Sequence, residues 1–368
     1  MVVLSLGAWE DEAVCCGCYY SCPGRIWQPG GCGHRGAAGR VAGGGFVLHH
    51  SQFFDTIVAM TQSFERVNDI ADVAERRPTF LAVGVFDGVH RGHQHLLQRM
   101  VAEARAGGAR PGVLTFFPHP KAVIQNLQGR IYLTTLEERL RLLAAQGVEL
   151  VIVHPFNDEV RHTRAADFVD RLVAYLDLRQ LWGGSFSLGY RREGTAEFLA
   201  ELGQVRGFTV RQIRDLVMWN GERVSSSRVR RELAEGDIAS VNGGLGRPFC
   251  VSGEVVMGDQ RGRTIGFPTA NLAVWAEQLL PANGVYVTQA WLGAERFMAA
   301  TNVGVRPTVN GHHVSVEAHL LDFDRDIYGA PLRLEFLGRI RAEQKFPGLD
   351  ALRAQIRQDV DQVRAQLS

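Results

Sequence analysis

Between residues 79 and 242, apolar runs of strand length alternate with longer amphipathic stretches, and this alternation constrains the fold more than any other feature. The pattern predicts strands at residues 80–86, 113–117, 150–153, 181–182 and 209–213, and helices at residues 93–106, 136–145, 165–176 and 224–242. Leu96, Leu97 and Met100 fall on one face of the first helix. Alternation of this kind favours a parallel sheet with helices on both of its faces.

After Gly246 the pattern changes to short strands separated by Gly, Pro and Asn. We expect these strands near residues 249–256, 284–288, 297–301, 314–320 and 332–337. Many short strands with turn residues between them predict a small β-barrel. The chain then closes with apolar residues at helical spacing, which predict one terminal helix with a single buried stripe. These residues are Leu349, Leu352, Ile356, Val360, Val363 and Leu367.

Residues 1–59 differ from the rest because they are rich in Gly, Cys and Arg and have no sustained period of 2 or 3.6. We therefore expect this segment to be a disordered extension, with Met60 opening the ordinary sequence. An alternative interpretation is a zinc site, since thiolates and imidazoles are the usual zinc ligands. Its four candidate ligands are Cys18, Cys22, Cys32 and His34.

Charge and hydropathy exclude several classes of function. Lys and Arg number 40 against 39 Asp and Glu, so the net charge of +1 gives no support for binding nucleic acid or a membrane surface. No apolar run approaches the roughly 20 residues that a membrane span requires. The start of the chain has no basic segment and contains Glu10, Asp11 and Glu12, which argues against a secretory signal. The expected location is the cytoplasm.

The first chemical motif is Gly84-Val-Phe-Asp-Gly-Val-His-Arg-Gly-His-Gln, at the junction between the first strand and the first helix. A helix N-terminus offers free N–H groups and partial positive charge, which suit a phosphate. His90 and His93 flank Gly92, and glycine lets the chain approach a ligand closely. Two imidazoles beside a nucleotide triphosphate can stabilise the charge that develops during nucleotidyl transfer. A surface turn that happens to carry two histidines is the plainer alternative.

This arrangement resembles the nucleotidyltransferase superfamily that carries His-x-Gly-His, and in particular the prokaryotic FAD synthetase family. Thr115-Phe-Phe-Pro-His-Pro and Val224-Ser-Ser-Ser-Arg-Val-Arg are similar to two further segments of that family. The resemblance implies a Rossmann-like adenylyltransferase domain in which Ser225, Ser226 and Arg228 contact the phosphates of ATP. The serines also suit the N-cap of a helix, and the two roles are compatible.

One segment departs from the family pattern. Gly183-Gly-Ser-Phe-Ser-Leu-Gly places Ser185 where the family carries Asp or Asn, and Leu188 where it carries Phe. Ser227 likewise replaces Thr. A hydroxyl at Ser185 supplies neither the charge of Asp nor the reach of Asn. This departure bears on the efficiency of adenylyl transfer and leaves the expected fold unchanged.

A second motif, Gly258-Asp-Gln-Arg-Gly-Arg-Thr-Ile-Gly-Phe-Pro-Thr-Ala-Asn, opens the barrel region. No Gly-x-x-x-x-Gly-Lys-Ser/Thr string occurs, so the chain is not a P-loop enzyme. Glycines can let backbone N–H groups wrap phosphates while arginines balance the charge. Thr269 and Asn271 project to one side of an extended segment and offer the hard oxygen ligands that suit Mg²⁺. The candidate phosphate-binding residues are Gly258, Arg261, Gly262, Arg263 and Gly266.

The full string resembles the riboflavin kinase signature, and Thr301-Asn-Val-Gly-Val-Arg-Pro-Thr and Val316-Glu-Ala-His-Leu-Leu-Asp-Phe are also similar to that family. The resemblance covers residues 78–368 and implies a six-stranded barrel with a terminal helix. It implies that Glu317 is the general base that takes the proton of the terminal ribityl hydroxyl. The alternative for Glu317 is an outward-facing strand residue with no catalytic role.

Together these motifs predict an extension at residues 1–59, an FMN adenylyltransferase domain at 60–244 and a riboflavin kinase domain at 245–368. The expected reactions phosphorylate riboflavin to FMN and adenylylate FMN to FAD, with ATP as co-substrate and Mg²⁺ required. One alternative, motivated by Ser185, is a monofunctional riboflavin kinase with a degraded first domain. Another is a flavin-binding regulator without activity. The sequence does not determine the oligomeric state.

Overall fold

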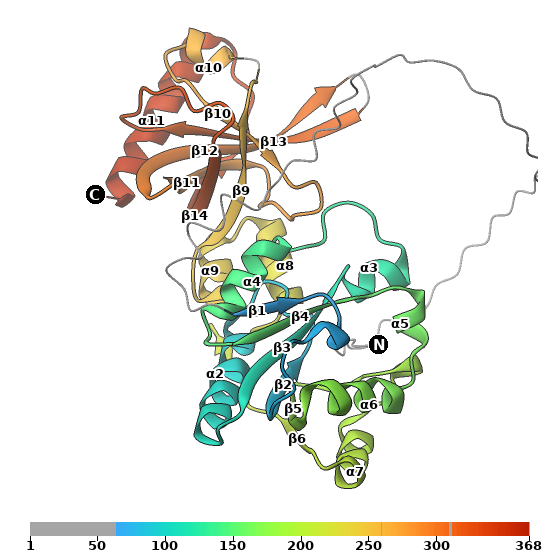
Figure 1. Ribbon diagram of the computed structural model, residues 1–368. Coiled ribbons are helices and arrows are strands. Elements are labelled where there is room, and N and C mark those ends of the chain that lie inside the picture. The colour runs from blue at the N-terminus through green and yellow to red at the C-terminus, as the bar shows by residue number, and fades with distance from the viewer. Residues whose placement is uncertain (1–63, 259, 309–310, 368) are drawn as a thin grey trace, which may run out of the picture.

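The computed structural model describes residues 64–258, 260–308 and 311–367 (Figure 1). They form an α/β unit, coloured blue to yellow, and a β-barrel, coloured orange to red. The expected extension at residues 1–59 and its four candidate zinc ligands lie outside the described residues.

The α/β unit is built on six parallel strands in the order β1-β4-β3-β2-β5-β6. The central strand β2 pairs with β3 on one side and with β5 on the other, so the chain reverses its direction of winding there. This confirms the expected parallel sheet. The strands are β1 (Glu65–Val67), β2 (Thr79–Val83), β3 (Arg110–Phe117), β4 (Leu150–Pro155), β5 (Leu178–Gly183) and β6 (Thr209–Gln212).

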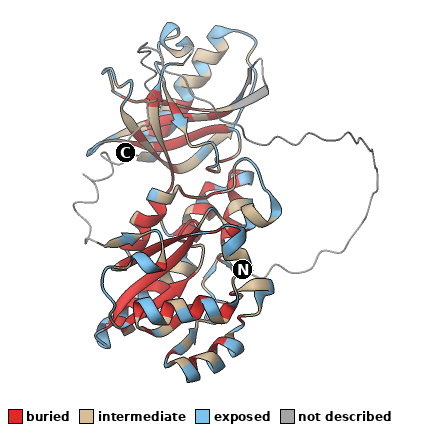
Figure 2. Ribbon diagram, turned by 45° about the vertical axis from the view of Figure 1, so that its right-hand side comes forward, coloured by how far each residue is buried: buried red, intermediate tan, exposed pale blue. Residues whose placement is uncertain are grey.

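Helices cover both faces of this sheet. Phe80 and Ala82 of β2 belong to the apolar cluster formed with α2 (Arg91–Ala106) and α4 (Leu136–Ala144). Leu81 belongs to the opposite cluster, with α6 (Ala165–Leu176). The strands of this sheet are largely buried, as their red colour in Figure 2 shows. Because both faces of β2 are buried, β2 is apolar at nearly every position and does not alternate between apolar and polar residues. Other helices are η1 (Ile70–Asp72), α3 (Pro120–Gln125), α5 (Asp158–His162), η2 (Tyr190–Arg192) and α7 (Ala196–Arg206).

The second unit is a closed antiparallel barrel in the order β10-β13-β12-β11-β14-β9, which confirms the expected six-stranded barrel. Alternate residues of β13, such as Val316 and Ala318, enter the apolar interior, so Glu317 between them faces outward. The strands are β9 (Phe249–Val256), β10 (Ala270–Val274), β11 (Gly284–Leu292), β12 (Glu295–Thr308), β13 (Gly311–Leu320) and β14 (Pro331–Ala342).

The terminal helix α11 (Leu349–Leu367) packs on the outside of the barrel, as expected from its apolar stripe. Val363 is buried there against Val287 and Leu321. Arg341 of β14 donates to Asp359 of α11, with an Nη2–Oδ2 distance of 2.7 Å. Apolar packing and a buried ion pair therefore fix this helix to the barrel wall.

Several elements differ from the sequence-based expectation, among them β1, α3, α5 and α7, which were not expected. The single helix expected at residues 224–242 is two helices, α8 (Ser226–Glu235) and α9 (Ile238–Leu245). Gly236 at φ 77° ends α8, and the Asp237 side chain caps α9, so the chain turns between them. Strand β10 lies inside the glycine-rich motif, where no strand was expected. A small hairpin of β7 (Met218–Trp219) and β8 (Glu222–Arg223) was also missed.

The two units meet through backbone and aromatic contacts, with α4, α8 and α9 lying between the sheet and the barrel (Figure 1). The N–H groups of Ile131 and Tyr132 donate to the carbonyl of Glu277, at 2.8 and 3.1 Å. Leu279 N–H donates to the carbonyl of Tyr132 at 2.7 Å. The rings of Tyr132 and Trp275 lie 4.8 Å apart. Trp275 directly follows β10, so this strand is anchored to the α/β unit.

A buried polar cluster adds to the same interface. The carboxylate of Glu138 in α4 accepts two hydrogen bonds from Arg141, at 2.7 and 2.9 Å. Its Oε1 also lies 3.5 Å from Sγ of Cys250 in β9 and 4.0 Å from Nη2 of Arg333 in β14. Burial alone would raise the pKa of Glu138, but Arg141 and the nearby arginines hold that pKa below its ordinary value. The carboxylate is therefore charged and links α4 to two barrel strands.

Two adjacent glycines in α9 allow a test of how the hairpin is held. A Cβ on Gly243 would collide with the indole of Trp219, whereas a Cβ on Gly244 would make ordinary contacts with Val229 Cγ2 at 3.5 Å and Val224 Cγ1 at 3.8 Å. Gly243→Ala should lower the free energy of unfolding by about 1–3 kcal/mol through overpacking. Gly244→Ala should leave it unchanged or raise it by up to about 1 kcal/mol, because alanine favours a helix. Urea unfolding of both variants measures the difference, and equal effects would contradict this account of the packing.

Candidate active sites

The first candidate site lies at the carboxyl ends of β2 and β5, where the strand order reverses. In open α/β sheets this is the crevice in which ligands bind. The Gly84–Gln94 motif follows β2, and Ser185 lies two residues beyond the end of β5. The sheet topology therefore brings the histidine motif and the segment that departs from the family pattern to the same crevice.

His90 and His93 are in direct contact at the start of α2. His90 is the N-cap residue, and its Nδ1 accepts from the N–H of His93 at 3.3 Å. The two rings are stacked, with centroids 3.7 Å apart. A Cβ on Gly92 would approach the His90 ring to 3.1 Å, so a larger residue there would disturb the pair. Because Nδ1 of His90 accepts, its Nε2 carries the proton and is the available donor.

Both imidazoles are neutral at pH 7. Burial, with the charges of Arg223 and Arg247, lowers the pKa of His90 to about 4 against the opposing effect of Asp87. Burial lowers the pKa of His93 as well, and His90 adds to this effect. In the part of the chain that the structure describes, Nδ1 of His93 is buried and makes no hydrogen bond. A neutral stacked pair can donate to phosphate oxygens without adding positive charge to the site.

The serines of α8 lie beside the histidine motif. Ser225 caps α8 by accepting from the N–H of Arg228 at 3.2 Å. Ser226 donates to the carbonyl of Asp87 at 3.0 Å, so the start of α8 is fixed to the loop that precedes α2. Arg228 is buried: its Nε donates to Glu232 at 2.6 Å and its Nη1 to the Glu222 carbonyl at 2.6 Å. Its guanidinium is thus engaged within the protein.

Asp87 is a buried carboxylate beside the candidate site that sequence reasoning did not single out. Its buried carboxylate accepts from the N–H groups of Leu133 and Thr134 and from Nη2 of Arg230, and it lies 3.6 Å from Nη2 of Arg139. Burial alone would raise the pKa of Asp87, but Arg230, Arg139 and the Leu133 N–H outweigh it and hold the pKa low. The sequence did contain a signal for the pairing of Asp87 with Arg230, because Asp87 lies inside the first motif and Arg230 is the last residue of the serine motif.

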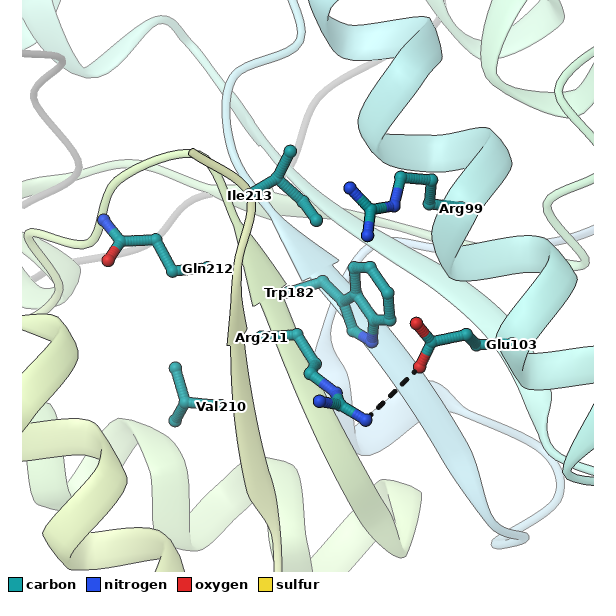
Figure 3. A pocket seen from close by; sticks show the side chains of 7 residues that line it. All are labelled: Arg99, Glu103, Trp182, Val210, Arg211, Gln212 and Ile213. Atoms are coloured by element: carbon teal, nitrogen blue, oxygen red, sulfur yellow. Dashed lines mark ion pairs between the residues drawn. The ribbon is translucent and has the colours of Figure 1, made fainter. Parts of the chain in front are cut away.

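A pocket of about 250 Å³ lies on the α2 side of β5 and β6 (Figure 3). Trp182 forms its floor, and Arg211 faces Glu103 across it at 3.6 Å. The remaining lining residues are Arg99, Val210, Gln212 and Ile213. The histidines and serines of the two motifs do not line this pocket, so it is separate from the first candidate site.

The second candidate site lies on the outer face of the barrel, on β10, β13 and β12. The strand register places Asn271 of β10 directly opposite Glu317 of β13. Asn302 of β12 lies opposite Glu317 on its other side. Directly opposed residues of antiparallel strands have Cβ atoms about 5 Å apart. Ser315 donates to Oε1 of Glu317 at 3.2 Å. Asn271 and Glu317, which are 46 positions apart in the sequence, are thus direct neighbours on the barrel. Asn302 is a further amide neighbour of Glu317 that the sequence analysis did not single out.

The glycine motif passes close to these residues. A Cβ on Gly258 would collide with the amide of Asn271, and a Cβ on Gly262 would collide with the Phe267 carbonyl oxygen and lie in ordinary contact, at 3.4 Å, with Oγ1 of Thr269. Gly266 has φ 86°, which favours glycine. Within the motif the chain forms one short helix, α10 (Arg261–Thr264). The glycines therefore let the backbone lie directly against the two candidate metal ligands.

A pocket of about 250 Å³ opens beside Thr269 at the mouth of the barrel. Arg263 of the glycine motif lines it, together with Asp324, Arg325 and Tyr328 of the loop after β13. The side chain of Arg261 lies outside the described residues. Its charged lining holds two arginines, Arg263 and Arg325, and two carboxylates, Asp324 and Asp326, beside an apolar surface, which is the mixed lining typical of a small-molecule site.

The donor set fits magnesium bound together with a nucleotide. Among the described residues, no group of three or more His, Cys, Asp or Glu side chains could hold a metal ion. Magnesium often uses only one or two protein oxygens and takes its other ligands from phosphates and water. The hydroxyl of Thr269 and the amide oxygen of Asn271, with Glu317 adjacent, match that arrangement.

Comparison with known proteins matches each of the two units to a described family. A family model described as FAD synthetase matches residues 72–228, and one described as riboflavin kinase matches residues 245–367. A bifunctional riboflavin kinase/FMN adenylyltransferase of Escherichia coli (strain K12) is 39% identical over 282 residues, which cover 76% of this chain and 90% of the relative. The protein of the same name from Bacillus subtilis (strain 168) is 32% identical over 290 residues, 77% of this chain and 91% of the relative.

A solved structure described as a macrolide-efflux protein from Streptococcus pneumoniae has a TM-score of 0.75. It is 28% identical in sequence, and the match covers 82% of this chain and 99% of the solved chain. That description applies to the other protein. In residues 64–367, as far as they are described, no helix is long and apolar enough to cross a membrane.

The fold, the two sites and these matches define a two-domain transferase that joins a nucleotidyltransferase-type α/β domain to a kinase barrel. The chain belongs to the bifunctional riboflavin kinase/FMN adenylyltransferase family.

The buried carboxylate of Asp87 gives a stability test. Asp87→Asn keeps the shape but leaves Arg139 and Arg230 without their counter-charge, so the free energy of unfolding should fall by about 3–5 kcal/mol. Asp170→Asn is the matched control, because its exposed pair with Arg206 is screened by water and its loss should have a much smaller effect. Urea unfolding at pH 7 compares the two, and a stability of Asp87→Asn equal to that of wild type would contradict the role of this carboxylate.

Proposed function

We propose that the chain makes FAD in two ATP-dependent steps. The barrel phosphorylates riboflavin to FMN, and the α/β domain adenylylates FMN to FAD with release of pyrophosphate. The observation that carries the proposal is the direct opposition of Asn271 and Glu317 beneath the glycine motif. We propose residues 60–244 and 245–368 as the two catalytic domains and the cytoplasm as the location.

In the kinase step, Glu317 accepts the proton of the terminal ribityl hydroxyl. The hydroxyl oxygen forms a bond to the γ-phosphorus of ATP, the bond between that phosphorus and the β,γ-bridging oxygen breaks, and ADP leaves. Ser315 donates to Glu317 and holds the orientation of its carboxylate. Thr269 and Asn271 would hold Mg²⁺, which when bound neutralises phosphate charge. Gly258, Gly262 and Gly266 allow the backbone to lie along the phosphates, and Arg261 and Arg263 balance their charge.

In the adenylyl transfer step, a phosphate oxygen of FMN attacks the α-phosphorus of ATP. The bond from that phosphorus to the α,β-bridging oxygen breaks, and pyrophosphate leaves. His90 and His93 stabilise the charge on the phosphate oxygens, with Nε2 of His90 as a donor. Ser225 and Ser226 place the N-terminus of α8 beside the phosphates. Arg228 supports this helix start from within, through Glu232 and the Glu222 carbonyl.

The decisive test supplies the purified protein with riboflavin, ATP and Mg²⁺, and separately with FMN, ATP and Mg²⁺. Chromatography should detect FMN in the first reaction and FAD in the second, and EDTA should stop both. FMN without FAD would identify a monofunctional riboflavin kinase and would attribute the loss to Ser185. Ser185→Asn should then restore FAD formation. Absence of both products would favour a flavin-binding regulator.

Site variants should separate the two activities. Asn271→Ala and Glu317→Ala should abolish FMN formation, because they remove a metal ligand and the base, while FMN-to-FAD conversion remains measurable. His93→Ala should have the reverse effect. Glu254→Gln, at a half-buried carboxylate on β9, is the control and should retain both activities. Parallel loss of both steps in any single site variant would show that the two sites are not independent.

A further inference from the structure

The backbone just before the histidine pair is strained. Val89 has φ 37°, in the left-handed region that a β-branched side chain rarely adopts. Gly88 before it has φ 81°, and His90 directly follows. A non-glycine residue in such a conformation is unfavourable and persists only where its surroundings hold it. The position of His90 therefore depends on whatever restrains Val89.

Two side chains bind the carbonyl oxygens of this strained segment. Gln94 Nε2 donates to the Val89 carbonyl at 2.8 Å. Arg247 donates from Nη2 to the Gly88 carbonyl at 2.8 Å and from Nη1 to the Val89 carbonyl at 3.3 Å. The guanidinium fork thus spans two consecutive carbonyls, which a single-point cation could not reproduce. Gln94 and Arg247 thus hold the carbonyl side of this segment, and the Val89 N–H bond to the Phe86 carbonyl at 3.1 Å and the buried Val89 side chain add to the restraint.

Arg247 does not belong to the sheet whose site it supports. It lies between the end of α9 and the start of β9, in the segment that connects the two units. Its Nη1 is 3.4 Å from the Leu245 carbonyl, and Nε2 of Gln94 also donates to that carbonyl at 2.8 Å. The connecting segment and the histidine loop are therefore joined by one hydrogen-bonded network.

We propose that Arg247 is a positioning residue for adenylyl transfer, acting through the carbonyls of Gly88 and Val89 to fix His90 and the N-terminus of α2. This inference rests on the proposed role of His90 and His93 in that step. Arg247 has no role in the kinase step. Without its fork, Val89 relaxes from its strained conformation, and the histidine pair moves relative to the bound phosphates. Misplacement of about 1 Å reduces turnover roughly 100-fold in other active sites.

The test uses the full chain and measures both reactions in each preparation. Arg247→Met should lower kcat for FAD formation roughly 10- to 100-fold, with KM for FMN within about threefold of wild type. Riboflavin kinase activity of the same sample should stay within about twofold. Arg247→Lys should recover part of kcat, because it keeps one donor. Unchanged kcat for FAD formation, or an equal loss in both reactions, would overturn the proposal.

A matched control separates positioning from general damage at the interface. Arg339 of β14 also donates to backbone carbonyls, at 3.2 Å to Glu235 of α8 across the interface and at 2.7 Å to Asn283 within the barrel, and makes no bond to the histidine loop. Arg339→Met should retain kcat for FAD formation, and a loss equal to that of Arg247→Met would overturn the proposal.

Two further variants keep the test decisive. If Arg247→Met fails to fold, Gln94→Leu removes the other donor to Val89 and should lower the same kcat, whereas an unchanged kcat would overturn the proposal. His93→Ala distinguishes this inference from the proposed function. Full FAD formation by His93→Ala overturns the role of the loop itself. If His93→Ala loses FAD formation while Arg247→Met retains it, only the positioning role of Arg247 is overturned.

Discussion

The carboxylate of Asp87 is the contact on which the arrangement of the α/β unit depends. It neutralises part of the charge of two arginines from different helices and accepts two backbone N–H groups of the segment at residues 133–134. Tyr132 of the same segment bonds to the barrel through Glu277 and Leu279. One short path of hydrogen bonds therefore runs from the loop before α2 to the barrel. A buried charge is tolerated here because it is paired and fully hydrogen-bonded.

The two sites use different means to bring reactive groups together. In the barrel, strand register alone places Asn271 opposite Glu317, and Gly258 lets the backbone of the glycine motif approach Asn271. In the α/β unit, a helix cap and stacked rings form the histidine pair, and a strained residue sets its position. The barrel site is thus built from regular structure. The α/β site depends on a loop that several distant segments restrain, including the connection to the barrel.

Sequence patterns predicted most of the architecture and missed particular elements for identifiable reasons. Strand β10 was hidden because it lies within a motif dominated by turn residues, and its pairing with β9 and β13 outweighs local propensity. The helix at residues 224–242 was overextended because the Gly236–Asp237 turn interrupts an otherwise helical pattern. Asp87 was overlooked because a lone acidic residue has no periodicity. Its partners lie 46 and 143 positions away.

The sequence by itself determined the two structural classes and the placement of the histidine motif at a helix N-terminus. These features depend on spacing within about a dozen residues, where helix and strand periodicity act directly. Only the tertiary structure decided that Glu317 lies opposite Asn271, that Arg228 is engaged internally, and that Arg247 supports the histidine loop. Strand register and packing between units join segments far apart in the chain, and no local pattern encodes those contacts.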